Sequence, residues 1–412
     1  MTLLDIISIL ITVSALFAYI NYRTFKLPTT IGIMVISLLF SLVLVVLGHL
    51  GWEKGVGTAG DLVKQIDFNT ALLNGMLGFL LFAGAMHVNL HDLMEKKWVI
   101  GSLASVGLLI STFLVGIGAY YVLRVFGIEL PFIYCLLFGS LISPTDPVAV
   151  MGILKTAGAS RSLETKIVGE SLFNDGVAIV IFLVIFGIAV NGDPISASHI
   201  GQLFLTETIG GALFGFACGW VVLQMLKRVD NYQVEVLLTL GLVAGGSTAA
   251  TEMHLSAPIA IVVAGLMIGN HGRRDAMSET TIAHLDTFWE LIDEILNAIL
   301  FLLIGLEVMI ITVDKEIWMA GVVLAVVVLL ARLIAVGIPV NVMKLRTSFH
   351  PHVVKILTWG GLRGGISVAL ALALPAGEER DVILAITYII VVLSILVQGL
   401  TIGKLVEVTK DT

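Results

Sequence analysis

Two acidic residues lie inside a long apolar segment of the sequence, where a charge is costly. Glu170 and Asp175 belong to GESLFND (169–175), within the run KIVGESLFNDGVAIVIFLVIFGIAV (166–190). A carboxylate at membrane depth costs at least a few kcal/mol, and residues of this kind are usually retained for function. The segment therefore indicates a functional site inside a membrane.

Helical spacing groups the polar side chains of this segment on two adjoining faces. Ser171 and Asp175 are four residues apart and share one face, and Glu170 and Asn174 share the next. The carboxylate of Asp175 is a hard oxygen ligand that can exchange a proton for a small cation. The amide of Asn174 can hold that carboxylate in place and supply a neutral dipole.

A second interpretation is that these acids only pair with arginines and hold helices together. It applies more strongly to Glu170 than to Asp175, because Arg332 and Arg363 both lie within apolar segments and each needs a counter-charge. An unpaired guanidinium in lipid is costly.

Other ionisable residues rank lower as ion ligands. Glu207, Asp293 and Glu294 lie nearer the ends of apolar segments, where water can reach them. Glu307 follows FLLIGL and is a candidate for lining an access path, and the lone His87 is assigned a structural role.

The elements that position these residues are membrane helices. Of the 412 residues, 58% are hydrophobic and only 13% are charged, and the mean hydropathy is +1.04. A soluble domain typically has about 25% charged residues, so the composition indicates a polytopic all-α membrane protein. The apolar segments run almost from end to end, and the chain is predicted to be one integral membrane unit, residues 1–412, with no soluble domain.

A spanning helix needs roughly 20 mostly apolar residues, and the sequence contains thirteen such candidates. The predicted spans are 3–22, 29–49, 69–89, 98–122, 130–154, 165–190, 200–226, 232–251, 255–270, 288–312, 317–343, 351–375 and 382–405.

The distribution of Lys and Arg predicts the orientation. Of the 23 such residues, 16 lie in or beside loops that follow odd-numbered spans and 5 in loops that follow even-numbered spans, with Arg332 and Arg363 inside spans. Positive residues favour the cytoplasmic side. This predicts an external N-terminus and a cytoplasmic C-terminus, and a missing span would scramble the alternation.

Two of the predicted spans are interrupted. Span 5 contains GSLISPTDPVAVMG (139–152), in which Pro144 and Pro147 remove backbone donors on either side of Asp146. Span 12 contains TWGGLRGGISVALAL (358–372), with four glycines around Arg363. Non-helical backbone at membrane depth persists only where it is buried in protein or lines a wet cavity.

The two interruptions are separated by seven spans, and this odd number makes the segments antiparallel. Discontinuous helices at matching positions of inverted repeats are typical of a secondary transporter and indicate its binding site. Either segment alone could be an ordinary proline or glycine kink in a continuous helix. The two together favour paired broken helices, because one carries a negative charge and the other a positive one.

Four motifs then establish a resemblance. SPTDPVAV, GESLFNDGVAIV, FLLIGLE and WGGLRGGISVALAL, in this order, resemble those of the monovalent cation:proton antiporters. The branch resembled is the electroneutral NhaP type, which is related to the animal Na+/H+ exchangers. The resemblance covers nearly the whole chain.

The resemblance implies a set of site residues. Asp175 would be the main ligand for Na+ and for the proton, with oxygens from Ser171 and the backbone of Thr145, and Asp146 nearby. Asn174 would be the partner that is typical of the electroneutral branch.

It also implies two arginine roles and one departure. Glu170 would form a structural ion pair with Arg332, and Arg363 would offset the helix ends where the two unwound helices of spans 5 and 12 cross. Some relatives carry an acid on span 3, whereas this sequence has Ala83 and His87 there.

For the whole chain, the resemblance implies a homodimer with a dimerisation domain and a core domain that move as an elevator. Ranges 69–190 and 288–405 would hold the broken-helix repeats and form most of the ion-binding core. The expected activity is exchange of Na+, Li+ or K+ for H+ across the inner (cytoplasmic) membrane. It implies no enzymatic activity, no cofactor and no nucleic-acid partner.

Two functions from other classes remain to be weighed. Two membrane aspartates sharing one proton would suit an intramembrane aspartyl protease, but the glycine-flanked aspartate expected of such proteases is missing and Asp146 stands between prolines. An ion channel would need an open hydrated pathway. The choice among Na+, Li+ and K+ is left open.

Overall fold

The computed structural model describes residues 3–50, 68–147, 150–151, 154, 161–192, 196–309, 314–344, 349 and 351–410. Within these ranges every regular element is a helix, in agreement with the predicted all-α class. The first helices along the chain are α1 (Leu3–Ile20), α2 (Thr29–His49), α4 (Phe68–Thr70), α5 (Leu77–Met86), α6 (Leu90–Glu95), α7 (Lys97–Ser102), α8 (Leu108–Val125), α9 (Phe132–Ile142) and α11 (Arg161–Phe186).

The later helices complete the bundle. They are α12 (Ala197–Leu205), α13 (Gly211–Leu226), α14 (Tyr232–Glu252), α15 (Ala257–Met267), α16 (Arg273–Asp275), α17 (Glu279–Glu307), α18 (Lys315–Met343), α19 (Val353–Trp359), α20 (Gly365–Leu372), α21 (Glu378–Leu393) and α22 (Leu400–Lys410). Short π-helical segments extend or join several of them, at Asn21–Phe25, Ala71–Met76, Leu103–Gly107, Gly187–Asn191, Thr206–Gly210, Ile268–Gly272 and Ser394–Gly399.

Eight helical segments of the described residues are long and apolar enough to cross a membrane. They are Leu4–Phe25, Thr29–Leu47, Lys97–Val125, Leu163–Val190, Ile200–Leu226, Tyr232–Glu252, Lys315–Met343 and Glu378–Val408. Helices in the other five predicted ranges are shorter, interrupted or, in α17, richer in acidic residues. The exact count of thirteen spans therefore stays a prediction.

Helix α17 differs from the expected tenth span, which was placed at 288–312. It begins at Glu279, where the Ser278 hydroxyl accepts a hydrogen bond from the Thr281 amide (3.3 Å), and it continues unbroken for 29 residues. At 1.5 Å per residue the helix is about 43 Å long, which exceeds the hydrocarbon thickness. Its polar first turns can thus lie outside the membrane while the apolar end is embedded.

Small residues let α2 and α17 approach closely. The hydroxyls of Ser37 and Ser41 donate to the carbonyls of Leu302 (2.8 Å) and Gly305 (2.9 Å). A Cβ at Gly305 would lie 2.3 Å from the Ser37 hydroxyl oxygen, so the contact requires glycine. This is the packing expected of helices that associate in lipid through small residues and hydroxyl hydrogen bonds.

The two predicted interruptions are present in the structure. Helix α9 ends before Pro144, and the α19–α20 pair is separated by residues 360–364. The backbone amide of Asp146 donates to the carbonyl of Leu362 (2.8 Å), which forms an isolated antiparallel β-bridge between the two breaks. The bridge supplies the backbone partners that the helices no longer provide.

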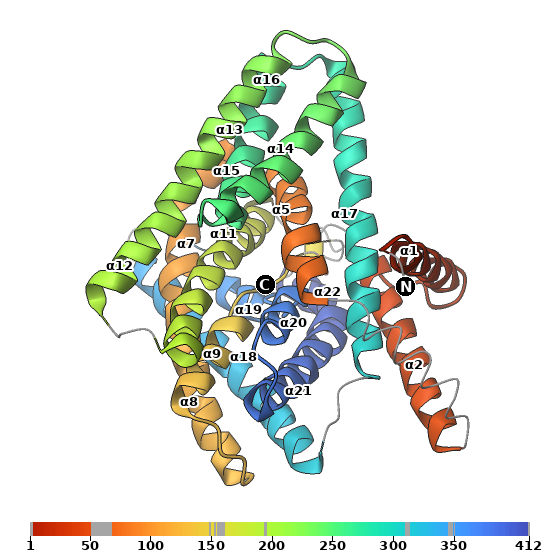
Figure 1. Cartoon of the computed structure of the whole chain (residues 1–412), viewed down its shortest axis with the longest axis vertical. Helices are drawn as coiled ribbons and strands as arrows, with labels where there is room; N and C mark the ends of the chain where they lie inside the picture. The colour runs from red at the N-terminus through yellow and green to blue at the C-terminus, as the bar shows by residue number, and fades with distance from the viewer. Residues whose placement is uncertain are drawn as a thin grey trace.

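The buried apolar side chains of the described residues form separate clusters. One contains buried side chains of α8, α9, α18, α20 and α21, and another contains Phe82, Val243, Ile261 and Trp289 of α5, α14, α15 and α17. Figure 1 shows α13 to α16 gathered at the top of the view and α8, α18 and α21 at the bottom.

Candidate ion-binding site

Helix α11 buries all four polar side chains singled out from its sequence. Asp175 is 6% exposed, and Glu170, Ser171 and Asn174 are each 1% exposed. A buried carboxylate needs a partner, a proton or a cation. The burial of Asp175 therefore fits a group that binds a positive species.

Thr145, in the first helix break, connects to α11 through two hydrogen bonds. The Ser171 hydroxyl donates to the Thr145 carbonyl, and the Asn174 Nδ2 donates to the Thr145 hydroxyl (2.9 Å). The role predicted for Asn174, to hold the Asp175 carboxylate, stays a prediction, and the Asn174 amide binds Thr145. The unwound segment is thus attached to the helix that carries the aspartate.

Asp146 brings a second carboxylate to the same place. Its side chain is half-buried. Its carboxylate is close enough to Asp175 for a negative charge on one to oppose a negative charge on the other. A Cβ at Gly364, in the second break, would lie 2.2 Å from Asp146 Oδ2. The glycine-rich sequence of the second break is therefore what allows its backbone to approach the Asp146 carboxylate.

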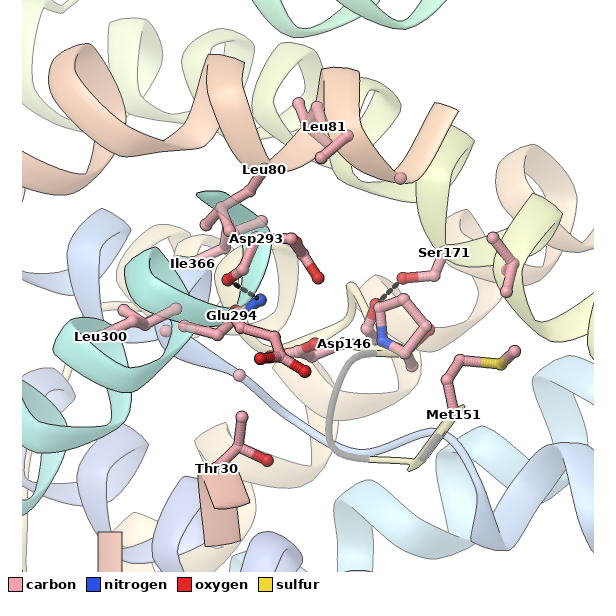
Figure 2. Close-up of a pocket in the computed structure, with 18 of the residues that line it drawn as sticks. Thr30, Leu80, Leu81, Asp146, Met151, Ser171, Asp293, Glu294, Leu300 and Ile366 are labelled. Atoms are coloured by element: carbon pink, nitrogen blue, oxygen red, sulfur yellow. Dashed lines mark hydrogen bonds between the residues drawn. The ribbon is translucent and has the colours of Figure 1, made fainter. Parts of the chain in front are cut away.

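These residues face a cavity of about 980 Å³, whose walls include Thr145, Asp146, Ser171 and Asp175. Figure 2 shows Ser171 and Asp146 on one side of it and Asp293 and Glu294 of α17 on the other. The cavity also reaches Ala83 and the exposed His87 of span 3, so this segment provides a wall but no carboxylate.

The acidic face of α17 was missed as part of the site. Glu290, Asp293, Glu294 and Asn297 all line the cavity. Their i, i+3, i+4 and i+7 spacing is visible in ELIDEILN (290–297), but Asp293 and Glu294 were predicted to lie near the end of a span, where water can reach them. Glu307, the candidate for an access path, is not among the residues that line this cavity.

The buried arginine of α18 has a carboxylate partner. Arg332 Nη1 donates to Glu170 Oε1, and Arg332 Nη2 donates to the Leu357 carbonyl at 3.2 Å. A Cβ at Gly361 would lie 2.7 Å from Arg332 Nε, so glycine is needed there to admit the guanidinium. The pair joins α11, α18 and α19.

The second buried arginine lies at the helix breaks. Arg363 Nη1 donates to the carbonyls of Ser143 and Pro144 (the latter at 3.0 Å), and its backbone amide donates to the Ser394 hydroxyl (3.1 Å). Ser143 and Pro144 directly follow α9, so the positive charge lies where the negative end of the helix dipole is located. The arrangement compensates carbonyls that the interrupted helix leaves without partners.

Comparisons with known proteins agree on one family. The family profile described as "Sodium/hydrogen exchanger, transmembrane" matches residues 11–408. The Na+/H+ antiporter NhaP of Pseudomonas aeruginosa is 52% identical over 409 residues, which are 98% of this chain and 96% of that protein. The Na+/H+ antiporter NhaH of Halobacillus dabanensis is 34% identical over 344 residues, 82% of this chain and 83% of that one.

A solved structure has the same fold. The sodium proton antiporter MjNhaP1 from Methanocaldococcus jannaschii, at pH 8, superposes with a TM-score of 0.76 over 98% of this chain and 99% of that chain. The sequence identity is 19%, so this likeness concerns the fold alone.

Proposed function

The chain belongs to the transmembrane sodium/hydrogen exchanger family, and from that premise we propose that it exchanges Na+ for H+, with Asp175 binding one or the other. The membership confirms the resemblance drawn from the four sequence motifs, and it makes the chain a transporter rather than an enzyme. The protein is an integral multi-pass membrane protein.

The observation that carries this proposal is a buried carboxylate on the wall of a large cavity, surrounded by oxygen atoms. Asp175 is 6% exposed, and the cavity wall beside it includes Ser171, Thr145 and Asp146. Carboxylate, carbonyl and hydroxyl oxygens suit hard cations. The hydroxyl of Ser171 donates its proton to Thr145 and keeps its lone pairs for a cation.

One carboxylate can couple the two fluxes, because it binds either a cation or a proton and each excludes the other. When Asp175 carries Na+ or H+, its charge is neutralised, and the loaded site can pass its cation or proton across the membrane. An empty, ionised Asp175 would leave a bare charge in the interior, which is costly. Exchange without leakage follows from this difference.

We further propose that the exchange is electroneutral, one cation for one proton. Arg332 is paired with Glu170, and an arginine side chain keeps its proton in proteins. A lysine in that place could lose a proton when desolvated and so add a second one to the cycle. The ion pair thus contributes no net charge to either crossing.

The cavity supports an orientation. Its exposed lining residues Lys26, His87 and Glu407 belong to segments that the Lys and Arg distribution assigns to the cytoplasm. We propose that the structure is open to the cytoplasm, with the N-terminus outside. The family resemblance also leads us to propose a homodimer and an elevator movement. The Asp146–Leu362 bridge between the two broken helices supports the proposal that they cross.

The deciding experiment reconstitutes the purified protein in proteoliposomes with a pH-sensitive dye. Addition of Na+, Li+ or K+ in turn should release an imposed proton gradient, fastest with Na+ or Li+. A K+ response faster than the Na+ response would favour a K+/H+ antiporter of the same fold. A cation flux that does not change with the opposing proton gradient would indicate a channel. Cleavage of a membrane peptide would indicate a protease.

A further inference from the structure

A graded row of polar side chains follows the cavity side of α17. Glu290 and Glu294 are exposed, Asp293 is half-buried and Asn297 is 1% exposed. Their spacing places them on one helix face, and all four line the cavity. The face therefore leads from water toward the buried end of the cavity.

Asp293 is the half-buried acid of this row, and Figure 2 shows it across the pocket from Asp146 of the broken-helix segment. The Asp146 carboxylate is close enough to Asp293 to oppose a second negative charge there. Asp146 is also the charged neighbour of Asp175. Three carboxylates from three separate elements thus form a series, and Figure 2 shows Asp293 and Asp146 in the same pocket.

Asn297 supplies a second, independent observation. Its Nδ2 donates to the carbonyl of Asp293 (2.8 Å), which fixes the orientation of the amide. Its Oδ1 is buried and has no hydrogen-bond partner within the described part of the chain. A buried acceptor without a donor is unfavourable, so this oxygen is suited to a ligand that is positively charged.

We propose that Asp293 and Asn297 form a second cation-binding position in the cavity, which holds a monovalent cation before it reaches Asp175. The ligands are the Asp293 carboxylate and the Asn297 Oδ1, both hard oxygen donors. The inference rests on the proposed function for the identity of the cation. The binding itself requires no exchange.

The first test compares two carboxylates of α17 in proteoliposomes. Asp293→Asn should raise the KM for Na+ about tenfold, equivalent to about 1.4 kcal/mol, and leave the maximal rate within about twofold. Glu279→Gln removes the same charge from the exposed first turn of α17, outside the cavity, and should change the KM less than about twofold. Equal shifts in both variants would mean a diffuse negative field and would overturn the proposal, as would an unchanged KM in Asp293→Asn.

The second test measures binding without transport. Radioactive sodium binding to purified Asp175→Asn protein should persist, and adding Asp293→Asn or Asn297→Ala should weaken it at least about tenfold. Size-exclusion profiles identify any variant that fails to fold. No sodium binding to Asp175→Asn, or binding unaffected by the second substitution, would overturn the proposal.

These outcomes are separable from those of the proposed function. If wild-type proteoliposomes show no exchange while sodium binding to Asp175→Asn still depends on Asp293, the proposed function fails and the second position stands. If the wild type exchanges Na+ for H+ but adding Asp293→Asn does not change sodium binding to the Asp175→Asn protein, the second position is disproved and the proposed function stands.

Discussion

The backbone amide of Asp146 donates to the backbone carbonyl of Leu362 at 2.8 Å, and this single bridge joins the two helix breaks. Both breaks lie within predicted spans, where an unpartnered amide is expensive. The bridge also fixes the backbone of Asp146, whose carboxylate is close enough to Asp175 to oppose a second negative charge there. Its geometry depends on Gly364, which packs against the Asp146 side chain.

Gly364→Ala should therefore damage both stability and exchange. The new Cβ would lie 2.2 Å from Asp146 Oδ2, and overpacking of this kind costs about 1–3 kcal/mol. A lower melting temperature in detergent and a reduced exchange rate are expected. Gly101→Ala in α7 is the matched control, because its Cβ meets nothing within 4 Å, and it should leave both measurements near those of wild type.

Asp175→Asn should abolish exchange in a folded protein. The substitution keeps the size of the side chain and removes the charge and the titratable proton. Dye-based proton flux in proteoliposomes measures the loss, and a size-exclusion profile checks the fold. Sodium-dependent proton flux near the wild-type level would show that another group carries the ion.

Glu170→Gln should mainly reduce stability, because it leaves the buried Arg332 without a counter-charge. Removing one partner of a buried pair costs about 3–5 kcal/mol. The double variant Glu170→Gln with Arg332→Gln should regain part of the lost melting temperature. A double variant as unstable as the two single losses combined would contradict an energetic coupling between the paired residues.

Exchange should be independent of membrane voltage. Asp175 alternates between one Na+ and one H+, and the Glu170–Arg332 pair keeps its net charge throughout. The rate in proteoliposomes clamped with K+ and valinomycin should stay constant as the imposed potential is changed. A steep voltage dependence, or a sustained current after a sodium jump, would disprove one-for-one exchange and indicate that Asp146 titrates independently.

The sequence predicted the breaks and the buried acids well, because their causes are local. Pro144 and Pro147 lack amide donors, and the glycines around Arg363 permit close approach, so both interruptions follow from residue chemistry. The hydropathy of α11 likewise indicated that Asp175 is buried. Such signals need no knowledge of neighbouring helices.

Residues whose role depends on a neighbouring helix were harder to assign. The sequence shows that Asp293 and Asn297 share a face of α17, but the rotation of that helix toward the cavity is set by its packing on α2 and α5. The sequence likewise did not indicate the hydrogen bond from Asn174 to Thr145, because Thr145 comes to lie beside α11 only when the helix break folds. Tertiary contacts decide both cases.

The buried guanidinium of Arg332 has a mechanical consequence. It binds Glu170 of α11 and the Leu357 carbonyl of α19. Separating α18 from α11 would therefore leave two unpaired charges in a medium of low dielectric, and separating it from α19 would break a buried hydrogen bond. These three helices should behave as one stiff body.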